Sequence, residues 1–303
     1  MDNSLPLVSI IIPVYNRERF IEKALESAVN QTYTNIEIIV VDNKSTDNTW
    51  HILQDWIKKD NRIKVFQNER NLGPVLNWQE CIKKSSGEFI KILWSDDWID
   101  YDFLDKSLPL IDDDTAFVIS NIKIIKDNSI LYYFKYKKQI FSKKEYLDDI
   151  ILYGKHAFPV SPGCALFRKK DIINSFILSV PNGDNLDSMK NGAGNDLLLF
   201  LTTTINYSKI RISDTTSYFR YHDDSLTVSN NLMLYYEWSK IYFIEQNHLL
   251  AYEAIYKVKY WKLYYINKKK AYKNLYASLN FHYRDVFQII QFIFKKIYYK
   301  SFK

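Results

Sequence analysis

The sequence predicts an α/β protein built on a doubly wound, mostly parallel sheet, and three observations support this fold class. Apolar runs rich in β-branched residues recur through the N-terminal third, as LVSIIIPVYN, IEIIVVD, RIKVF and GEFIKIL. Segments with apolar residues at helical spacing follow the first of these runs. The connections between the runs are short. Strand and helix alternation with short connections is typical of a parallel sheet.

Each element of the first half can be justified in order. Leu7–Asn16 is expected to contain a strand buried on both faces, because its apolar run is continuous. Arg17–Gln31 is expected to be a helix, since Phe20, Ile21, Ala24, Leu25 and Ala28 share one face. A second strand starts at Ile36, and a polar turn leads from it into the next helix. After the third strand, Gly73 and Pro74 open another helix with proline in its first turn.

The second half is less regular. TAFVISNIKII and ILYYFKY predict a hairpin, SPGCALFRKKDI predicts a strand that enters a helix, and NDLLLFLTTTI predicts a short helix. KIRISDTTSYFRYHDDSLT predicts a strand with a polar exit, and the pattern after Asn231 is helical and aromatic.

Composition excludes several protein classes. The chain has 303 residues, of which 47% are hydrophobic, so a folded core is expected. Its two cysteines, Cys81 and Cys164, argue against a disulfide framework and a structural zinc site, and they fit a reducing compartment. We see neither a secretory leader nor an apolar run of about 18 residues. A cytoplasmic protein is therefore expected, with attachment to a surface left open.

The segment ILWSDDWID places Asp96 and Asp97 side by side between Trp94 and Trp98. Adjacent carboxylates repel each other and are costly to desolvate unless a cation or hydrogen-bond donor lies beside them. The pair is therefore either an exposed turn before a helix or part of a metal or nucleotide site. Four strand ends carry polar clusters, at Pro13–Asn16, Asp42–Asn43, Asn68–Asn71 and Asp96–Asp97. Ligands of such sheets bind at the carboxyl ends of the strands, which favours the site.

SIIIPVYNR, VVDNKSTDNT, NLGPVLNW, GEFIKILWSDDW and GNDLLL occur in this order. With these motifs, the chain resembles the family 2 glycosyltransferases of the GT-A fold over about residues 5–225. The resemblance implies a catalytic domain at 1–230, with a Rossmann-like nucleotide-binding half at about 1–110 and an acceptor half at about 111–230. Residues 231–303 would form a helical C-terminal appendage.

The resemblance also implies roles for individual residues. The nucleotide would be held by the ends of the first strands and the loops beside them, at Pro13, Tyr15, Asn16, Arg17, Asp42, Asn71 and Asp96. A carboxylate such as Asp42 can accept a hydrogen bond from a pyrimidine N3–H, and an aromatic ring such as Tyr15 can cover the base.

Asp97 would be the direct ligand of Mn²⁺ or Mg²⁺, which neutralises charge on a departing diphosphate. The family often has an additional aspartate where this chain has Trp94. Asp196 would be the catalytic base, although a carboxylate at a helix start is also an ordinary cap. Relatives usually have glutamate where Asn195 stands. His222 is either a further metal ligand or a structural residue.

The C-terminal segment is basic and aromatic. Residues 231–303 contain 13 Lys/Arg against 4 Asp/Glu, and 21 of the 73 residues are Phe, Tyr or Trp. Arg284, Gln288, Gln291 and Lys295 share one face of a predicted helix. The segment is therefore either a packed appendage with a basic, solvent-exposed face or a peripheral membrane contact on anionic lipid. We expect the membrane contact, since many relatives act on lipid-linked glycans. Without a recognised motif, we expect no nucleic-acid partner.

The sequence therefore predicts an inverting, metal-dependent glycosyltransferase. It would move a sugar from a nucleotide diphosphate sugar to a hydroxyl of a glycan acceptor, in our expectation lipid-linked. The product would be a bacterial surface polysaccharide such as capsule, O-antigen or lipooligosaccharide, made at the inner face of the cytoplasmic membrane. Two alternatives stay open, a nucleotidyltransferase with a similar nucleotide-binding half and a catalytically silent glycan-binding relative.

Overall fold

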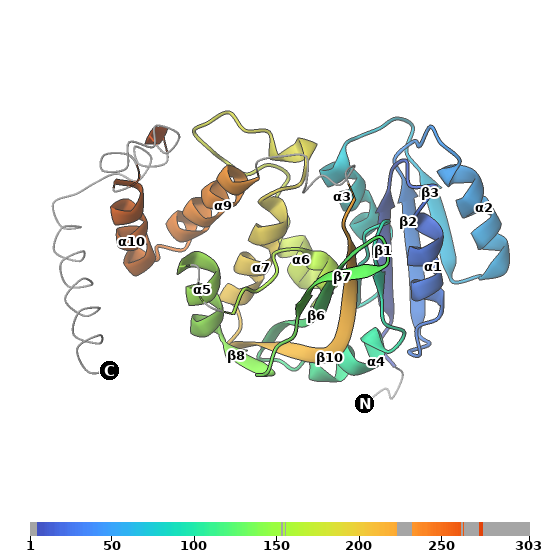
Figure 1. Cartoon of the computed structure of the whole chain (residues 1–303), viewed down its shortest axis with the longest axis horizontal. Coiled ribbons are helices and arrows are strands. Elements are labelled where there is room, and N and C mark those ends of the chain that lie inside the picture. Colours follow the sequence, from blue (N-terminus) through green and yellow to red (C-terminus); the bar gives the residue numbers. More distant parts are fainter. Residues whose placement is uncertain are drawn as a thin grey trace. The chain divides into compact units, whose positions relative to one another are not determined.

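The structure is a computed structural model that describes residues 5–152, 154, 156–222, 232–261, 263 and 273–274. The chain divides into two compact units. The first contains the described residues up to Ser179 and from Ser188 to Leu232, and the second contains Val180–Asp187 and those from Met233 onward. Figure 1 gives the labels of the elements.

The first half of the larger unit alternates strands and helices as predicted. Its elements are β1 (Val8–Val14), α1 (Ile21–Val29), β2 (Ile36–Asp42), α2 (Thr49–Lys59), β3 (Ile63–Gln67), α3 (Pro74–Lys84) and β4 (Phe89–Ile92). The four strands are all parallel and lie in the order β3-β2-β1-β4. In this register Val14 lies opposite Asp42 and Asp42 lies opposite Gln67, so the carboxyl ends of β1, β2 and β3 meet at one edge.

The second half extends the same sheet. It contains β5 (Trp98–Ile99), α4 (Phe103–Ser107), β6 (Thr115–Lys126), β7 (Ser129–Phe134), β8 (Ile140–Ser142), α5 (Lys143–Leu152), β9 (Ala165–Arg168), α6 (Lys169–Ser175), α7 (Asn195–Ile205) and β10 (Lys209–Arg220). The predicted hairpin is present as β6 and β7, which pair antiparallel. The predicted strand entering a helix is β9 with α6.

The sheet is mostly parallel, and its order continues from β4 through β9, β6 and β10 to β5. β9 runs antiparallel to both neighbours, whereas β6 and β10 are parallel to each other. The two-residue strand β5 pairs antiparallel with β10 and thereby attaches the segment after the acidic pair to the end of the sheet. The predicted α/β, mostly parallel architecture is confirmed.

Helices cover both faces of the sheet, as in a doubly wound fold. Alternate residues of β1 and β2 form one core with apolar residues of α1, α2 and α4, including Leu25, Leu53 and Phe103. Because successive strand residues point to opposite faces, Ile11 and Ile39 face the other side, where α3 packs against β1 and β2. The strand ends are thus held between two apolar layers.

The smaller unit contains α9 (Met233–Gln246) and α10 (Leu250–Trp261). The buried Glu237 of α9 accepts hydrogen bonds from Lys259 and Tyr260 of α10. Trp238 Nε1 donates to Asp184 Oδ2 over 2.7 Å. C-terminal helices are therefore present, whereas the stripe predicted through Arg284 and Lys295 lies outside the described residues. Within the described part of the chain, no helix is both long and apolar enough to cross a membrane.

Candidate functional site

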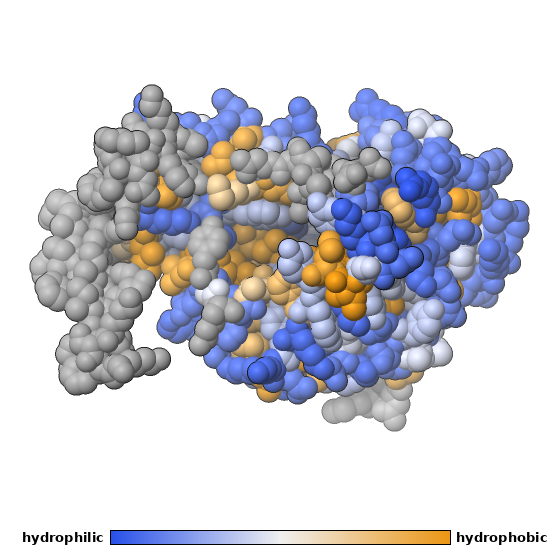
Figure 2. Space-filling view, viewed as in Figure 1, coloured by the Kyte–Doolittle hydropathy of each residue, from blue (hydrophilic) through white to orange (hydrophobic). Residues whose placement is uncertain are grey.

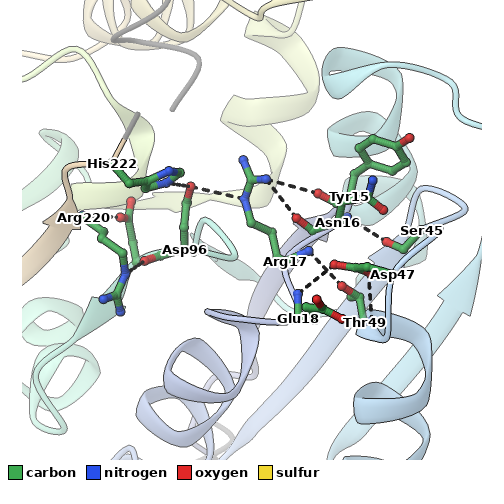
Figure 3. A network of polar contacts seen from close by, with 11 residues as sticks. Tyr15, Asn16, Arg17, Glu18, Ser45, Asp47, Thr49, Asp96, Arg220 and His222 are labelled. Atoms are coloured by element: carbon green, nitrogen blue, oxygen red, sulfur yellow. Dashed lines mark hydrogen bonds and ion pairs between the residues drawn. The ribbon is translucent and has the colours of Figure 1, made fainter. Parts of the chain in front are cut away.

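The loops that follow β1 and β2 are joined by side-chain hydrogen bonds (Figure 3). Asn16, which adopts a positive φ of 50°, receives the Thr46 amide on its Oδ1 over 2.8 Å and donates its own amide to Ser45 Oγ over 2.9 Å. Arg17 donates its amide to Thr49 Oγ1 over 2.8 Å. These bonds span about thirty residues of sequence. They fix the loop that carries three of the predicted nucleotide-binding residues, Tyr15, Asn16 and Arg17.

Asp42 lies at the end of β2 and is completely buried. Its carboxylate receives the Ser45 amide and hydroxyl and, over 2.8 Å, the side-chain amide of Gln67. Asp42 therefore organises the turn that contacts the Asn16 loop. Pro13 lies one residue before the end of β1 and is partly buried, while Tyr15 is 38% exposed, as an aromatic side chain available to cover a base would be.

A cluster of four asparagines closes the space between β2, β3 and α3. Asn43 Nδ2 donates to Asn71 Oδ1 over 2.8 Å, and Asn43 Oδ1 accepts from Asn68 and from the Leu72 amide. Asn77 in turn accepts from Asn68 and donates to the Val41 carbonyl. The predicted residue Asn71 is thus held by a network whose centre, Asn43, is 2% exposed.

Sequence reasoning placed Asn43 only in a polar cluster at a strand end, without naming it as a nucleotide-binding residue, and assigned no role to Asn77. The signal for Asn77 was present, because this residue lies on the face of α3 that also buries Val75, Trp78, Cys81 and Ile82. A polar side chain among buried apolar ones needs hydrogen-bond partners, which marks it as part of a network.

The acidic pair meets residues from both ends of the larger unit (Figure 3). Asp96 Oδ2 lies 3.4 Å from Arg17 Nε and 3.0 Å from His222 Nε2. Asp97 Oδ1 accepts the Arg220 amide over 2.8 Å, and Arg220 Nε donates to the Asp96 carbonyl. The structure therefore brings together four residues that the sequence singled out: Arg17, Asp96, Asp97 and His222.

The two carboxyl groups differ in their surroundings. Burial opposes ionisation of Asp96, but the hydrogen bond from His222 and the charge of Arg17 hold the pKa of Asp96 below its ordinary value. Burial and the neighbouring Asp96 charge raise the pKa of Asp97 well above its ordinary value. The charges of Lys91 and Arg220 and the hydrogen bond from the Arg220 amide lower the pKa of Asp97, but they do not outweigh burial and the Asp96 charge.

Aromatic rings and further carboxylates hold this segment against β10. The Arg220 guanidinium lies 4.9 Å from the ring centroids of both Phe20 and Trp98, and Trp98 stacks on Tyr218 at 5.1 Å. Asp100 accepts hydrogen bonds from the Thr216 amide and the Tyr218 hydroxyl, both over 2.9 Å. Asp100 was not predicted, although its place in a run of closely spaced acids, with Asp96, Asp97 and Asp102, could have indicated it.

Trp94 occupies the place where relatives often carry a further aspartate. Its Nε1 donates to Ser161 Oγ over 2.9 Å, and its ring packs edge-on against Trp78 at 5.7 Å. A Cβ at Gly163 would lie only 2.7 Å from the Trp94 ring, so only glycine allows this close approach. Trp94 is therefore a packed aromatic side chain that contributes no charge to the pair.

Asp196 lies on a different element, at the second residue of α7. The preceding Gly192 and Gly194 have φ values of 74° and 88°, which other residues rarely adopt. Asp196 Oδ1 accepts the amides of Gly194 and Leu197 over 2.9 and 2.7 Å. The carboxylate thus binds backbone amides at the helix start, although the N-cap position itself is occupied by Gly194 and not by Asp196.

A series of side-chain contacts connects the loop before Asp196 to Trp94, two residues before Asp96. Trp78, which packs on Trp94, also packs edge-on against Phe176 at 4.8 Å. Asn195 Nδ2 donates to the carbonyls of Ile177 and Leu178, and its Oδ1 is buried without a partner among the described residues. Asn195 therefore anchors the start of α7 to the segment after Phe176.

The donor set for a metal is small. Among the described residues, no group of three or more His, Cys, Asp or Glu side chains is arranged to hold an ion. Mg²⁺ in nucleotide sites is commonly held by one or two carboxylates together with phosphate oxygens. Asp97 fits such a minimal donor set, because a cation would offset the repulsion between the two carboxylates. His222 Nδ1 is buried without a partner in the described part of the structure.

Comparisons with known proteins agree with this geometry. The family model "Glycosyl transferase family 2" matches residues 9–176. The chain is 34% identical over 148 residues to the Campylobacter jejuni "GalNAc(5)-diNAcBac-PP-undecaprenol beta-1,3-glucosyltransferase", covering 47% of this chain and 48% of that protein. It is 39% identical over 108 residues to the Bacillus subtilis "Putative teichuronic acid biosynthesis glycosyltransferase TuaG", covering 36% and 43%. The matches thus span less than half of each relative.

A solved structure extends the likeness to nearly the whole chain. The crystal structure of S. aureus TarS 1-349 in complex with UDP-GlcNAc aligns with a TM-score of 0.63 over 94% of this chain and 78% of that chain, at 20% identity. This likeness concerns the fold. With the family match, which covers more than half of the sequence, it shows that the chain belongs to the family 2 glycosyltransferases and has their GT-A fold.

Proposed function

We propose that the protein is an inverting, metal-dependent glycosyltransferase that moves a sugar from a nucleotide diphosphate sugar to a hydroxyl group of a glycan acceptor. Family membership supports sugar transfer. The nucleotidyltransferase alternative gains no support from the comparisons, while a catalytically silent relative is the alternative that experiment must exclude.

The observation that carries the proposal is the cluster of Arg17, Asp96, Asp97 and His222 at the carboxyl edge of the sheet. Arg17 extends from the loop after β1, which also carries Tyr15 and Asn16. In parallel α/β sheets, nucleotides bind at this edge. We therefore assign Pro13, Tyr15, Asn16, Arg17, Asp42 and Asn71 to the nucleoside side of the site, and Asp96 to the ribose or a bound water.

Inversion by direct displacement requires one base on the acceptor side. We propose that Asp196 removes the proton of the acceptor hydroxyl as that oxygen attacks C1 of the donor sugar, while the bond from C1 to the diphosphate oxygen breaks. Its fixed Oδ1 would orient the carboxylate toward the acceptor. The two glycines before it support this role, since they allow close approach of substrate.

The leaving diphosphate gains negative charge. Arg17 lies beside Asp96 and would contribute positive charge there, and His222 lies within hydrogen-bond distance of the same carboxylate. We propose that Asp97 holds Mn²⁺ or Mg²⁺, with His222 as a candidate second ligand. When bound, the cation would neutralise the phosphate oxygens of the leaving group.

The names of relatives suggest the acceptor class. One relative acts on an undecaprenol-linked glycan and another is named for teichuronic acid biosynthesis. We therefore propose a lipid-linked acceptor in bacterial surface polysaccharide synthesis, with the reaction at the cytoplasmic face of the membrane. Peripheral membrane contact through residues 231–303 is part of this proposal, although most of that segment lies outside the described residues.

A thermal-shift screen of UDP, dTDP and GDP with and without Mn²⁺ tests the donor site. A ligand present at 100 times its Kd stabilises the folded state by about 2.7 kcal/mol. We expect one nucleoside diphosphate to raise the Tm, and to do so more strongly with Mn²⁺. Release of that diphosphate from a panel of donor sugars then tests turnover. Stabilisation without any release would indicate a silent binding protein, and no stabilisation would contradict the donor site.

A further inference from the structure

The hairpin of β6 and β7 exposes an unusual number of apolar side chains. In β7, the exposed fractions are 56% for Ile130, 42% for Leu131, 62% for Tyr132 and 47% for Tyr133. Figure 2 shows hydrophobic residues gathered where β7 lies in Figure 1, with hydrophilic residues beside them. Consecutive residues of a strand point to opposite faces, so both faces of β7 are exposed.

This exposure differs from that of an ordinary edge strand, which packs one face on the core. Tyr132 stacks on Phe134 at 6.3 Å, and these two rings pack along one face of β7. Contiguous apolar surface of this kind marks a site of interaction with another molecule or a membrane. The exposure of both faces of β7 favours a partner that can contact both of them.

The charge of the hairpin indicates the nature of that partner. The stretch 122–138 contains five lysines and one aspartate, a net charge of +4. Lys123 lies 5.0 Å from the Tyr133 ring centroid, and Lys126 lies 5.0 Å from that of Tyr221, so cations are interleaved with the aromatic rings. Lys138 pairs with Glu145. Two copies meeting through this surface would bring like charges together, which disfavours self-association.

We infer that the β6–β7 hairpin, residues 122–138, docks on the surface of an anionic lipid bilayer. Aromatic side chains favour the depth of the lipid headgroups, and lysines are attracted by the negative surface potential. Apolar side chains on both faces would enter the headgroup boundary, which a purely polar polyanion could not accommodate. The hairpin provides all three features within one short segment.

The hairpin is attached directly to the candidate site. Its Ile125 lies opposite Arg220 of β10 and accepts the Tyr221 amide over 2.7 Å. The next residue, His222, contacts Asp96. A docked hairpin would therefore hold the acidic pair close to the bilayer. This consequence rests on the proposed function, because it matters only if the acceptor is lipid-linked.

Co-sedimentation of the full-length protein with vesicles tests the inference. Vesicles of phosphatidylcholine with and without phosphatidylglycerol are compared at low and high salt. We expect binding only to the anionic vesicles, and weaker binding as salt rises, because exposed charges are screened. The triple variant L131S/Y132S/Y133S should reduce the partition coefficient by about tenfold or more, since three apolar contacts are lost together.

Two further variants separate the possible contributions. K126E/K135E/K137E reverses charge without removing apolar surface and should also reduce binding about tenfold or more. Ile173→Ser, which changes an apolar residue of α6 that is 56% exposed, is the matched control and should bind like the wild type. The thermal shift with nucleoside diphosphate should be unchanged in all three variants, because none of these residues belongs to the candidate site.

Three outcomes would overturn the inference. The first is absence of binding by the wild-type protein to anionic vesicles at low salt. The second is wild-type binding by both hairpin variants, particularly if K295E/K296E/K300E/K303E abolishes it and so assigns membrane contact to the C-terminal segment alone. The third is a wild-type dimer that the triple variant dissociates, which would make the hairpin a protein interface. A nucleotide shift with no vesicle binding would reject the hairpin inference and leave the donor site supported.

Discussion

The nucleotide-side strand ends and the loop that carries Asp196 are built in different ways. At the strand ends, residues distant in sequence contact one another, as in Asn16 with Thr46, Asn43 with Asn71 and Arg17 with Asp96. The carboxylate of Asp196 receives backbone amides of close neighbours in sequence, Gly194 and Leu197. The donor edge is therefore preorganised by contacts between distant segments, whereas backbone amides close in sequence contribute to the orientation of Asp196.

Among the substitutions that test this difference, a change at Asp97 should reduce activity the most. Asp97→Asn removes the charge proposed to hold the cation, so we expect donor turnover to fall by about 10³-fold, corresponding to several kcal/mol of transition-state stabilisation. The Mn²⁺-dependent part of the nucleotide thermal shift should disappear while the fold survives. Asp113→Asn, on an exposed loop, is the matched control. Full activity of Asp97→Asn, or wild-type activity in excess chelator, would contradict the metal proposal.

Asp196→Asn should separate chemistry from donor binding. We expect transfer to fall by about 10²-fold or more, the usual contribution of a general base, with nucleotide affinity almost unchanged. The measurements are kcat with a soluble acceptor and the Kd of the nucleoside diphosphate. The isosteric amide can still accept from Gly194 and Leu197, so helix α7 should remain intact. A parallel loss of nucleotide affinity would show that Asp196 serves the donor site or the fold.

Asn43→Ala should show how far the donor edge depends on its network. The substitution removes the acceptor of the partly buried Leu72 amide and one of the two acceptors of Asn68, so we expect the free energy of unfolding to fall by about 2 kcal/mol. Asn30→Ala removes one exposed hydrogen bond and should change stability by about 0.5 kcal/mol or less. Urea unfolding measures both. Equal effects would mean that the asparagine cluster does not preorganise this edge.

The difference between local contacts and contacts of distant segments also explains what the sequence could predict. The alternation of apolar runs and helical segments predicted the sheet, because strands and helices have distinct local periodicities. The convergence of Asp42, Asn71 and Asp96 at one edge followed from the parallel topology. The contact of His222 with Asp96 joins residues 126 positions apart and was suggested only by family resemblance. The antiparallel insertion of β9 and the exposed second face of β7 have no local signal, because tertiary packing decides both.

Lys91 is a further case that sequence alone did not resolve. It interrupts the apolar run of β4 and is completely buried, with its ammonium group 4.5 Å from the Phe103 ring centroid. Its Nζ donates to the carbonyls of Ile92 and Gly163. Burial lowers the pKa of Lys91 to about 7, although the charges of Cys164 and Asp97 act in the opposite direction. The sequence shows a lysine among apolar residues but not which of its two protonation states the fold favours.

The Lys91 pKa leads to the smallest prediction, a dependence of stability on pH. In the unfolded chain the lysine keeps its proton up to about pH 10.5, whereas the folded chain releases it near pH 7. Between these values the unfolded state binds more protons at this site, so the contribution of Lys91 to the free energy of unfolding rises with pH, by at most about 1.4 kcal/mol per pH unit. Lys91→Met removes the titrating group and keeps most of the buried side chain.

The measurement is therefore the stability of the wild type minus that of Lys91→Met, from urea unfolding between pH 6 and 10. This difference should be flat below about pH 7 and should rise above it in favour of the wild type. The hydrogen bonds to Ile92 and Gly163 are lost in the variant at every pH, so they shift the curve without changing its slope. Ile10→Val, at the position of β1 opposite Lys91, creates a small cavity and removes no titrating group. The stability that this variant loses relative to the wild type should therefore be the same at every pH. Parallel curves for wild type and Lys91→Met would mean that Lys91 stays charged in the folded core, which would require a carboxylate such as Asp97 to balance it.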